Sequence, residues 1–365
     1  MTTVTEAALL EALKTVIDPH TAQDFVSTRQ LKNLRISDGG GVSFSVELGY
    51  PARSQFALLR QALTDAARQV PGVGEVKVEI DSRIVSHAVQ RGVQLLPTVK
   101  NIVAIASGKG GVGKSTTSVN LALALAAEGA RVGLLDADIY GPSLPTMLGA
   151  SGRPESEDGQ TMQPKENHGV QVMSIGFLVD ADQAMIWRGP MATQALEQLL
   201  RQTNWGELDY LIVDMPPGTG DIALTLSQRV PLTGAVIVTT PQDIALLDAR
   251  KGLKMFEKVG VPILGIVENM AVHVCSNCGH VEHVFGSGGA ARMAADYGVQ
   301  MLGALPLAMS IREQADSGRP TMVADPDGEI AAVYRQVART VAVKIAQQAK
   351  DFSAKFPTIS ISKNT

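Results

Sequence analysis

The chain has 365 residues, of which 45% are hydrophobic and 4% aromatic, and its formal net charge is −4. This length allows two domains with well-buried cores, and few aromatic residues are typical of an α/β protein filled with Ala, Val, Leu and Ile. The slightly acidic balance excludes the basic surface that nucleic acid binding requires. No apolar run is long enough to span a bilayer and the start does not resemble a signal peptide, so we expect a cytoplasmic protein without nucleic acid or membrane partners.

Residues 1–91 are predicted to form a small α+β domain. A glycine-rich turn between the first two predicted strands indicates a hairpin. Residues 92–100, which include Pro97, are expected to be a linker. The predicted elements of the small domain are helices over 9–17 and 56–70 and strands over 34–36, 44–50 and 76–80.

Residues 101–349 are predicted to form an α/β domain with a doubly wound, mostly parallel sheet. Apolar runs and helix-like stretches alternate here, which is the pattern of this α/β architecture. Residues 151–168 are polar without periodicity and are expected to be a loop, and residues 350–365 a flexible tail. The predicted strands cover 102–107, 132–137, 170–175, 210–215, 234–240 and 263–268, and the last long helix covers 328–349 and docks on the sheet.

A glycine-rich loop carries the most specific motif of the chain. Residues 108–115 read GKGGVGKS and fit the phosphate-loop pattern G-x-x-x-x-G-K-[ST] between a predicted strand and a helix-like stretch. In this context backbone N–H groups hold the phosphates of a nucleoside triphosphate, Lys114 supplies a positive charge and the Ser115 hydroxyl binds Mg²⁺. The loop therefore predicts that residues 101–349 are a domain of P-loop NTPase type. The predicted nucleotide-binding residues of the loop are Gly108, Lys109, Gly110, Gly111, Val112, Gly113, Lys114, Ser115 and Thr116.

Three acidic residues follow two of the predicted strands. Asp136 and Asp138 face the same way because side chains in a strand repeat every two residues, and Asp214 ends a hydrophobic run like a Walker B element. Asp214 and Asp136 are predicted to bind Mg²⁺. Asp138 is predicted to orient the attacking water, with a turn or cap role as the alternative. Residues 215–221, MPPGTGD, follow like a switch loop.

The two cysteines of the chain, Cys275 and Cys278, form a C-x-x-C-G knuckle in a polar loop. The glycine lets the backbone turn tightly, so both thiolates can bind one metal. A redox dithiol would be expected at a helix start near a thioredoxin-like unit, which is not predicted here. Two metal sites stay open: mononuclear zinc with His280 and His283, or a site shared by two chains with two thiolates from each, as in an iron–sulfur cluster.

The phosphate loop contains a second lysine, Lys109, and it resembles the deviant loop of the ATPase group that includes MinD, ParA and the nitrogenase iron protein. In that group the extra lysine reaches across a dimer interface to the partner's nucleotide. The resemblance therefore implies a homodimer in which Lys109 acts catalytically with Lys114 and Asp138. The same resemblance places Asn269 at the adenine edge.

Over nearly the whole chain the motifs resemble those of the Mrp/ApbC iron–sulfur cluster carrier ATPases. The resemblance implies that Cys275 and Cys278 hold a 4Fe–4S cluster that bridges a homodimer, and that the cluster passes from a donor to apo-proteins with slow ATP hydrolysis. Residues 1–91 are similar to a small domain of iron–sulfur assembly factors, but this copy lacks cysteine, so docking is expected of it. The motifs are residues 108–115, 136–143, 187–191, 214–221 and 268–270 with the C-x-x-C, then 311–313 and 316–320.

Two other functions use the same nucleotide motifs. A spatial-organiser ATPase of the MinD or ParA kind leaves the cysteine knuckle unexplained, and MinD-like organisers end in a basic amphipathic helix unlike residues 352–365. A zinc-bridged targeting ATPase needs a methionine-rich insertion to bind apolar tails, whereas the 13 methionines of this chain are scattered. Both are alternatives to the cluster carrier.

Overall fold

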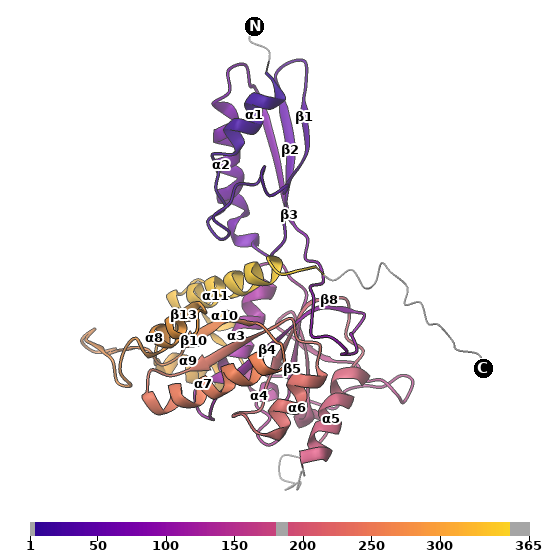
Figure 1. The fold of residues 1–365 in the computed structure, drawn as a ribbon, viewed down its shortest axis with the longest axis vertical. Coiled ribbons are helices and arrows are strands. Elements are labelled where there is room, and N and C mark those ends of the chain that lie inside the picture. The colour runs from indigo at the N-terminus through magenta and orange to yellow at the C-terminus, as the bar shows by residue number, and fades with distance from the viewer. Residues whose placement is uncertain (1–3, 180–188, 351–365) are drawn as a thin grey trace, which may run out of the picture.

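A large parallel sheet dominates the computed structural model, which describes residues 4–179 and 189–350 (Figure 1). A small unit built from the N-terminal residues stands beside α11 (Glu329–Ala346) of the larger unit. Trp187 and Arg188, which contribute to the family resemblance, and the expected tail beyond Lys350 lie outside the described residues.

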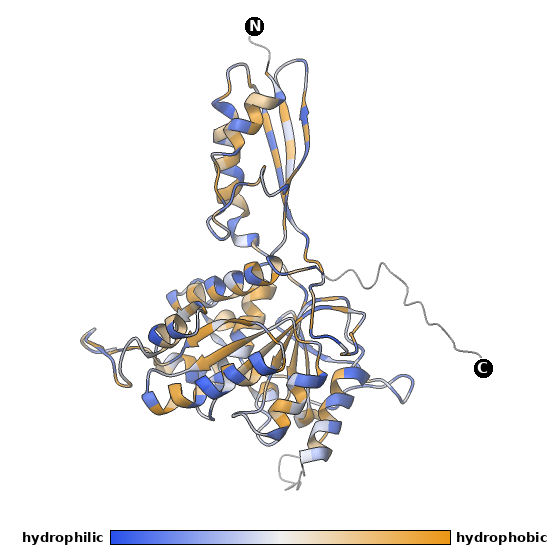
Figure 2. Cartoon of the chain, viewed as in Figure 1, coloured by the Kyte–Doolittle hydropathy of each residue, from blue (hydrophilic) through white to orange (hydrophobic). Residues whose placement is uncertain are grey.

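The small unit is a three-stranded sheet with two helices against it. β1 and β2 form the expected antiparallel hairpin, and β3 pairs with β2 in parallel because α2 carries the chain back along the sheet. Apolar and polar residues alternate along β2 (Figure 2), and the apolar ones are buried, as expected of a strand with one face against helices. The elements are α1 (Glu6–Leu13), β1 (Leu31–Ile36), β2 (Val42–Leu48), the 3₁₀ turn η1 (Arg53–Gln55), α2 (Phe56–Arg68) and β3 (Val76–Ser82).

The larger unit is built on an eight-stranded sheet that is parallel except at one edge. Its central strands are buried along their whole length and consist mainly of apolar residues, which is typical of a sheet covered on both faces (Figure 2). In the order in which they pair, the strands are β13 (Met301–Ala304), β10 (Ile263–Glu268), β9 (Gly234–Thr239), β4 (Val99–Ser107), β8 (Leu208–Asp214), β5 (Val132–Asp136), β7 (Val170–Ser174) and β6 (Lys165–Asn167).

Helices cover both faces of this sheet, so the predicted doubly wound α/β fold is confirmed. One face carries α3 (Lys114–Ala127), α4 (Leu144–Met147), α9 (Met309–Asp316), α10 (Thr321–Ala324) and α11. The other carries α5 (Gly189–Gln202), α6 (Asp221–Arg229), α7 (Asp243–Lys258) and α8 (Gly289–Asp296). Among the described residues, no helix is long and apolar enough to cross a membrane.

The edges of the sheet differ from the sequence expectation. β6 lies inside the segment 151–168 that is predicted to be a loop, and β13 has no predicted counterpart. Both strands are short and partly exposed, and each is held by pairing with one neighbour, so neither needs the hydrophobic pattern that identifies a central strand. β4 begins at Val99, two residues before the predicted start of the NTPase domain.

Candidate functional site

The glycine-rich loop joins the buried strand β4 to α3, as the sequence predicts. Gly111 and Gly113 have φ angles of +79° and +83°, in the left-handed region that residues with a side chain rarely adopt. A Cβ on Gly108 would lie 2.1 Å from the backbone carbonyl carbon of Asp248, because the loop starts against α7. Glycine therefore permits a backbone path that a residue with a Cβ would not follow.

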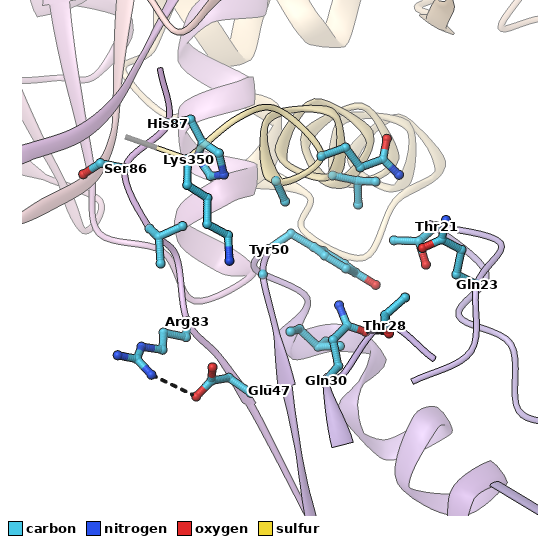
Figure 3. A pocket seen from close by; sticks show the side chains of 16 residues that line it. Thr21, Gln23, Thr28, Gln30, Glu47, Tyr50, Arg83, Ser86, His87 and Lys350 are labelled. Atoms are coloured by element: carbon cyan, nitrogen blue, oxygen red, sulfur yellow. Dashed lines mark hydrogen bonds and ion pairs between the residues drawn. The ribbon is translucent and has the colours of Figure 1, made fainter. Parts of the chain in front are cut away.

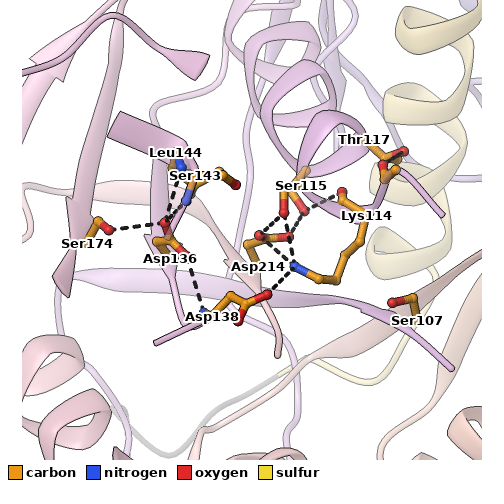
Figure 4. Close-up of polar contacts among 12 residues, drawn as sticks. Ser107, Lys114, Ser115, Thr117, Asp136, Asp138, Ser143, Leu144, Ser174 and Asp214 are labelled. Atoms are coloured by element: carbon orange, nitrogen blue, oxygen red, sulfur yellow. Dashed lines mark hydrogen bonds and ion pairs between the residues drawn. The ribbon is translucent and has the colours of Figure 1, made fainter. Parts of the chain in front are cut away.

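The acidic ends of β5 and β8 lie beside the first turn of α3 (Figure 4). Asp136 and Asp214 are fully buried and directly paired in the register of the two strands. Asp214 accepts hydrogen bonds from Ser115 Oγ at 2.6 Å and from Ser118 Oγ at 2.5 Å. Its Oδ2 lies 2.7 Å from Lys114 Nζ. The sequence motif does not include Ser118. Because residues three apart share one face of a helix, a serine three residues after Ser115 is the signal that could have predicted this contact.

The Asp136 carboxylate is surrounded by donors, and its pKa is raised to about 7, first by burial and then by the charge of Asp214. Asp138 lies 4.0 Å from Lys114 Nζ, and burial raises the pKa of its carboxyl while Lys114 acts in the opposite direction. The donors to Asp136 are the backbone N–H groups of Asp138, Ser143 and Leu144 and the Ser174 hydroxyl. The structure thus brings together all three predicted acids, Lys114 and Ser115.

The raised pKa of Asp136 makes the stability of the nucleotide-free protein depend on pH. An Asp carboxyl ordinarily has a pKa of 3.8, and in the folded protein the pKa of Asp136 is about 7. Between these values the folded state binds more protons, so the free energy of unfolding falls as pH rises. We expect urea unfolding from about pH 5 to about pH 8 to show the wild type losing stability relative to Asp136→Ala. A difference between the two proteins that stays constant over this range would contradict the assignment.

The loop after Asp214 is bonded to the strand that leads into the phosphate loop. The Met215 N–H donates to the Ile105 carbonyl at 3.0 Å, and the Gly218 N–H donates to the Ser107 carbonyl at 2.9 Å. α6 begins three residues after Gly218. The predicted switch segment therefore connects the start of the phosphate loop to α6 through a short backbone path.

Lys109 and Asn269 both contact residues of their own chain. Lys109 Nζ lies 3.4 Å from Oε1 of Gln242, the residue that directly precedes α7. Asn269 is buried at the end of β10, and its Nδ2 donates to the Val112 carbonyl at 2.9 Å. The roles toward a partner's nucleotide and toward adenine stay predictions. The pairing of Lys109 with Gln242 has no local sequence signal, because 133 positions separate the two residues.

The cysteine knuckle closes a two-stranded hairpin formed by β11 (His273–Val274) and β12 (Val281–Glu282). The Cys275 N–H donates to the His280 carbonyl at 2.9 Å, and Gly279 turns with φ +71°. Both thiols are free, with Cys275 partly exposed and Cys278 exposed. Backbone N–H groups of the turn, first that of Asn277, lower the pKa of the Cys275 thiol. Two accessible thiols, with the pKa of Cys275 lowered, suit metal binding.

The zinc site within one chain is not formed. Within the described residues, no group of three or more His, Cys, Asp or Glu side chains is placed to hold one metal ion. His283 Nδ1 lies 3.0 Å from the Ala271 carbonyl oxygen, and His280 Nε2 lies 3.9 Å from a Glu282 carboxylate oxygen. The two histidines thus contact other groups of the chain.

Comparison with known proteins identifies the family. The sequence matches the NUBPL iron-transfer P-loop NTPase family over residues 98–342 and the iron–sulfur cluster assembly protein family over residues 6–80. The chain belongs to the iron-transfer P-loop NTPase family. An iron–sulfur cluster carrier protein of Pseudomonas fragi is 62% identical over 277 residues, which are 75% of this chain and 96% of that protein. The family resemblance drawn from the motifs is confirmed.

Two solved structures share the fold of the larger unit. A nucleotide-binding protein from Archaeoglobus fulgidus, in complex with ADP, is 37% identical with a TM-score of 0.56, covering 64% of this chain and 91% of that chain. The cell division ATPase MinD of Pyrococcus furiosus is 23% identical with a TM-score of 0.50, covering 66% of this chain and 98% of that chain. The second match shows the fold alone, and it agrees with the predicted P-loop NTPase architecture.

Proposed function

We propose that this chain binds and hydrolyses ATP and, as a homodimer, carries an iron–sulfur cluster from a donor to apo-proteins in the cytoplasm. The observation that carries the proposal is a complete phosphate loop with its acids and a separate, accessible two-thiol knuckle in one chain of the iron-transfer family. The carrier name of the relative that is 62% identical supports the same function. The cluster is cargo, because a carrier must release it.

We further infer the division of labour along the chain. Residues 1–91 are the small domain that docks partners, 92–100 the linker, 101–349 the ATPase domain with the knuckle, and 350–365 a tail. The match of one family to residues 6–80 and of another to residues 98–342 supports this division.

The residues of the phosphate loop fit a magnesium nucleotide. The glycines leave room for phosphate against the backbone, and Ser115, Asp214 and Asp136 supply the hard oxygens that Mg²⁺ prefers. When bound, Mg²⁺ would neutralise charge on the phosphates. Lys114 would move from the Asp214 carboxylate toward the phosphate oxygens, and Asp138 would orient the attacking water.

Lys109 and Asn269 complete the proposed nucleotide site. Asn269 uses one N–H on the Val112 carbonyl and keeps a carbonyl oxygen and a second N–H for the adenine edge. Lys109 is part of the loop and only weakly held by Gln242, so it is available to reach the nucleotide of a partner subunit. That reach is the proposed reason for dimerisation in the presence of ATP.

The cysteine content requires two chains for a four-thiolate site. Each chain has two cysteines, and both lie in the knuckle, so a cluster with four thiolate ligands takes two from each subunit of a homodimer. We propose a 4Fe–4S cluster at this position, bound through Cys275 and Cys278 of both subunits.

Cluster transfer to an acceptor tests the proposed function. The protein is loaded anaerobically with iron and sulfide, freed of excess reagent and mixed with an apo-ferredoxin, with and without ATP and Mg²⁺. We expect the acceptor spectrum to form in the presence of an iron chelator, which removes free iron, and to form faster with ATP. Transfer that the chelator stops completely would show that iron is only released, and would contradict a carrier.

A further inference from the structure

The helices that flank the candidate nucleotide site run from that site toward the small unit. α3 begins at Lys114 and extends over 14 residues to its C-cap, Glu128, which is about 21 Å at about 1.5 Å per residue. α6 begins at Asp221, after the loop bonded to Ser107, and ends at Arg229, with Val230 as its C-cap. Their far ends lie at the side of the sheet opposite the carboxyl ends of the strands. The N-terminal part of the chain contacts this side.

The far end of α3 is held by the small unit and by α11. Glu128 is only 1% exposed, and its carboxylate accepts hydrogen bonds from Ser54 N at 2.9 Å and Ser54 Oγ at 2.7 Å. Arg339 of α11 binds the same carboxylate at 2.6 Å. A carboxylate at a helix C-terminus is disfavoured by the helix dipole, and a buried one needs partners. Glu128 is therefore satisfied only while Ser54 and Arg339 stay in place.

The far end of α6 is contacted by residues 83–98, the joining segment that connects β3 of the small unit to β4 of the large sheet. Gln90 Nε2 donates to the Ser227 carbonyl of the last turn at 2.8 Å, and Gln90 Oε1 accepts from the Leu232 N–H at 3.0 Å. The last carbonyl groups of a helix have no partner within the helix, and the Gln90 side chain supplies a donor to one of them, that of Ser227.

The start of β4 provides the third contact. Asn101 Nδ2 donates to the Val85 carbonyl at 3.0 Å, and Asn101 Oδ1 lies 3.0 Å from Nδ1 of the buried His87. β4 continues from here to Ser107 and the phosphate loop. α3, α6 and β4 thus each lie next to the candidate nucleotide site at one end and contact the N-terminal part of the chain at the other.

A cavity of about 700 Å³ lies between the small unit and α11, close to these contacts (Figure 3). Gln30 and Tyr50 of the small unit, His87 of the joining segment and Val343 and Gln347 of α11 contribute to its wall. Side chains therefore do not fill all of the space between the small unit and α11. On this side, fewer side-chain contacts hold the small unit against α11.

We propose that nucleotide binding tightens the docking of the small unit and its joining segment through α3, α6 and β4, so that this N-terminal part of the chain responds to the nucleotide state. The inference rests on the proposed nucleotide site. Nucleotide would fix the first turn of α3 and the loop before α6, and both helices transmit that restraint to Glu128 and Gln90. Because coupling between two sites is reciprocal, the docking contacts must strengthen nucleotide binding by the same factor.

Hydrogen exchange and calorimetry on the full chain test this coupling. We expect a nonhydrolysable ATP analogue with Mg²⁺ to slow amide exchange over residues 84–92 in the wild type by about fivefold or more. Gln90→Ala should remove this slowing and weaken analogue binding by about fivefold or more. Glu128→Gln should weaken analogue binding in the same direction, although neither residue contacts the phosphate loop.

Matched variants separate coupling from general effects of substitution. Gln94 is exposed in the same segment, and Glu257 is exposed near the end of α7. Gln94→Ala and Glu257→Gln should match the wild type in amide exchange and in analogue binding. If the analogue binds the wild type without slowing amide exchange over 84–92, or slows it equally in Gln90→Ala, the proposed coupling is wrong. The proposed nucleotide site is then unaffected. A wild type that does not bind the analogue at all would overturn the nucleotide site and, with it, this inference.

Discussion

Lys114→Ala is expected to reduce ATP hydrolysis by about 10²–10³-fold or more while leaving cluster assembly on the cysteines intact. The Lys114 side chain is 6% exposed and lies 2.7 Å from the Asp214 carboxylate. Without its charge, the developing negative charge on the phosphates would lose a directly placed positive partner next to the two buried acids of β5 and β8. The knuckle lies in a separate hairpin beyond β10, so the substitution does not reach the thiols.

The measurements are phosphate release, iron content after anaerobic loading, and recovery of an iron–sulfur enzyme in cells that lack this protein. Lys258→Ala, an exposed lysine at the end of α7, is the matched control and should hydrolyse ATP like the wild type. We expect Lys114→Ala to load iron normally and to fail in the cell. If it supports the enzyme as well as the wild type does, transfer is not coupled to ATP.

The parts of this site that depend on local pattern are predictable from the sequence. The phosphate loop follows from its motif, and the buried strands on which Asp136 and Asp214 stand follow from continuous apolar runs. Parallel strands bring their carboxyl ends to one edge, so the meeting of these acids with Lys114 also follows from the alternation of strands and helices. These predictions depend on local sequence patterns, namely a short motif and continuous apolar runs.

The contacts that join distant segments are not predictable in this way. Nothing near Glu128 indicates that Arg339 and Ser54 converge on its carboxylate, and nothing near Gln90 indicates that it caps α6. Such pairs depend on how the two units pack against each other, and the hydrophobic periodicity of each segment does not predict that packing. The edge strand β6 is missed for a related reason, because its pairing partner and not its own hydrophobicity keeps it in the sheet.

The double substitution Cys275→Ala and Cys278→Ala is expected to remove all cluster binding while sparing nucleotide binding. The two thiols are the only ones in the chain, and both are accessible at the end of a hairpin. Anaerobic loading of the wild type with iron and sulfide should give about four of each per dimer with the visible absorption of a cluster, and the variant should give neither. ADP binding with Mg²⁺ should be the same for both proteins, because the knuckle and the phosphate loop are separate.

The histidines beside the knuckle provide the control that distinguishes a shared cluster from zinc in one chain. His280→Ala with His283→Ala should keep full iron loading, because His283 faces the Ala271 carbonyl and His280 lies near Glu282. About two iron and two sulfide per dimer would identify a 2Fe–2S cluster with the same four thiolates. Zinc that is lost in both double variants, with no iron dependent on the cysteines, would instead make the knuckle a structural clamp of a dimeric ATPase.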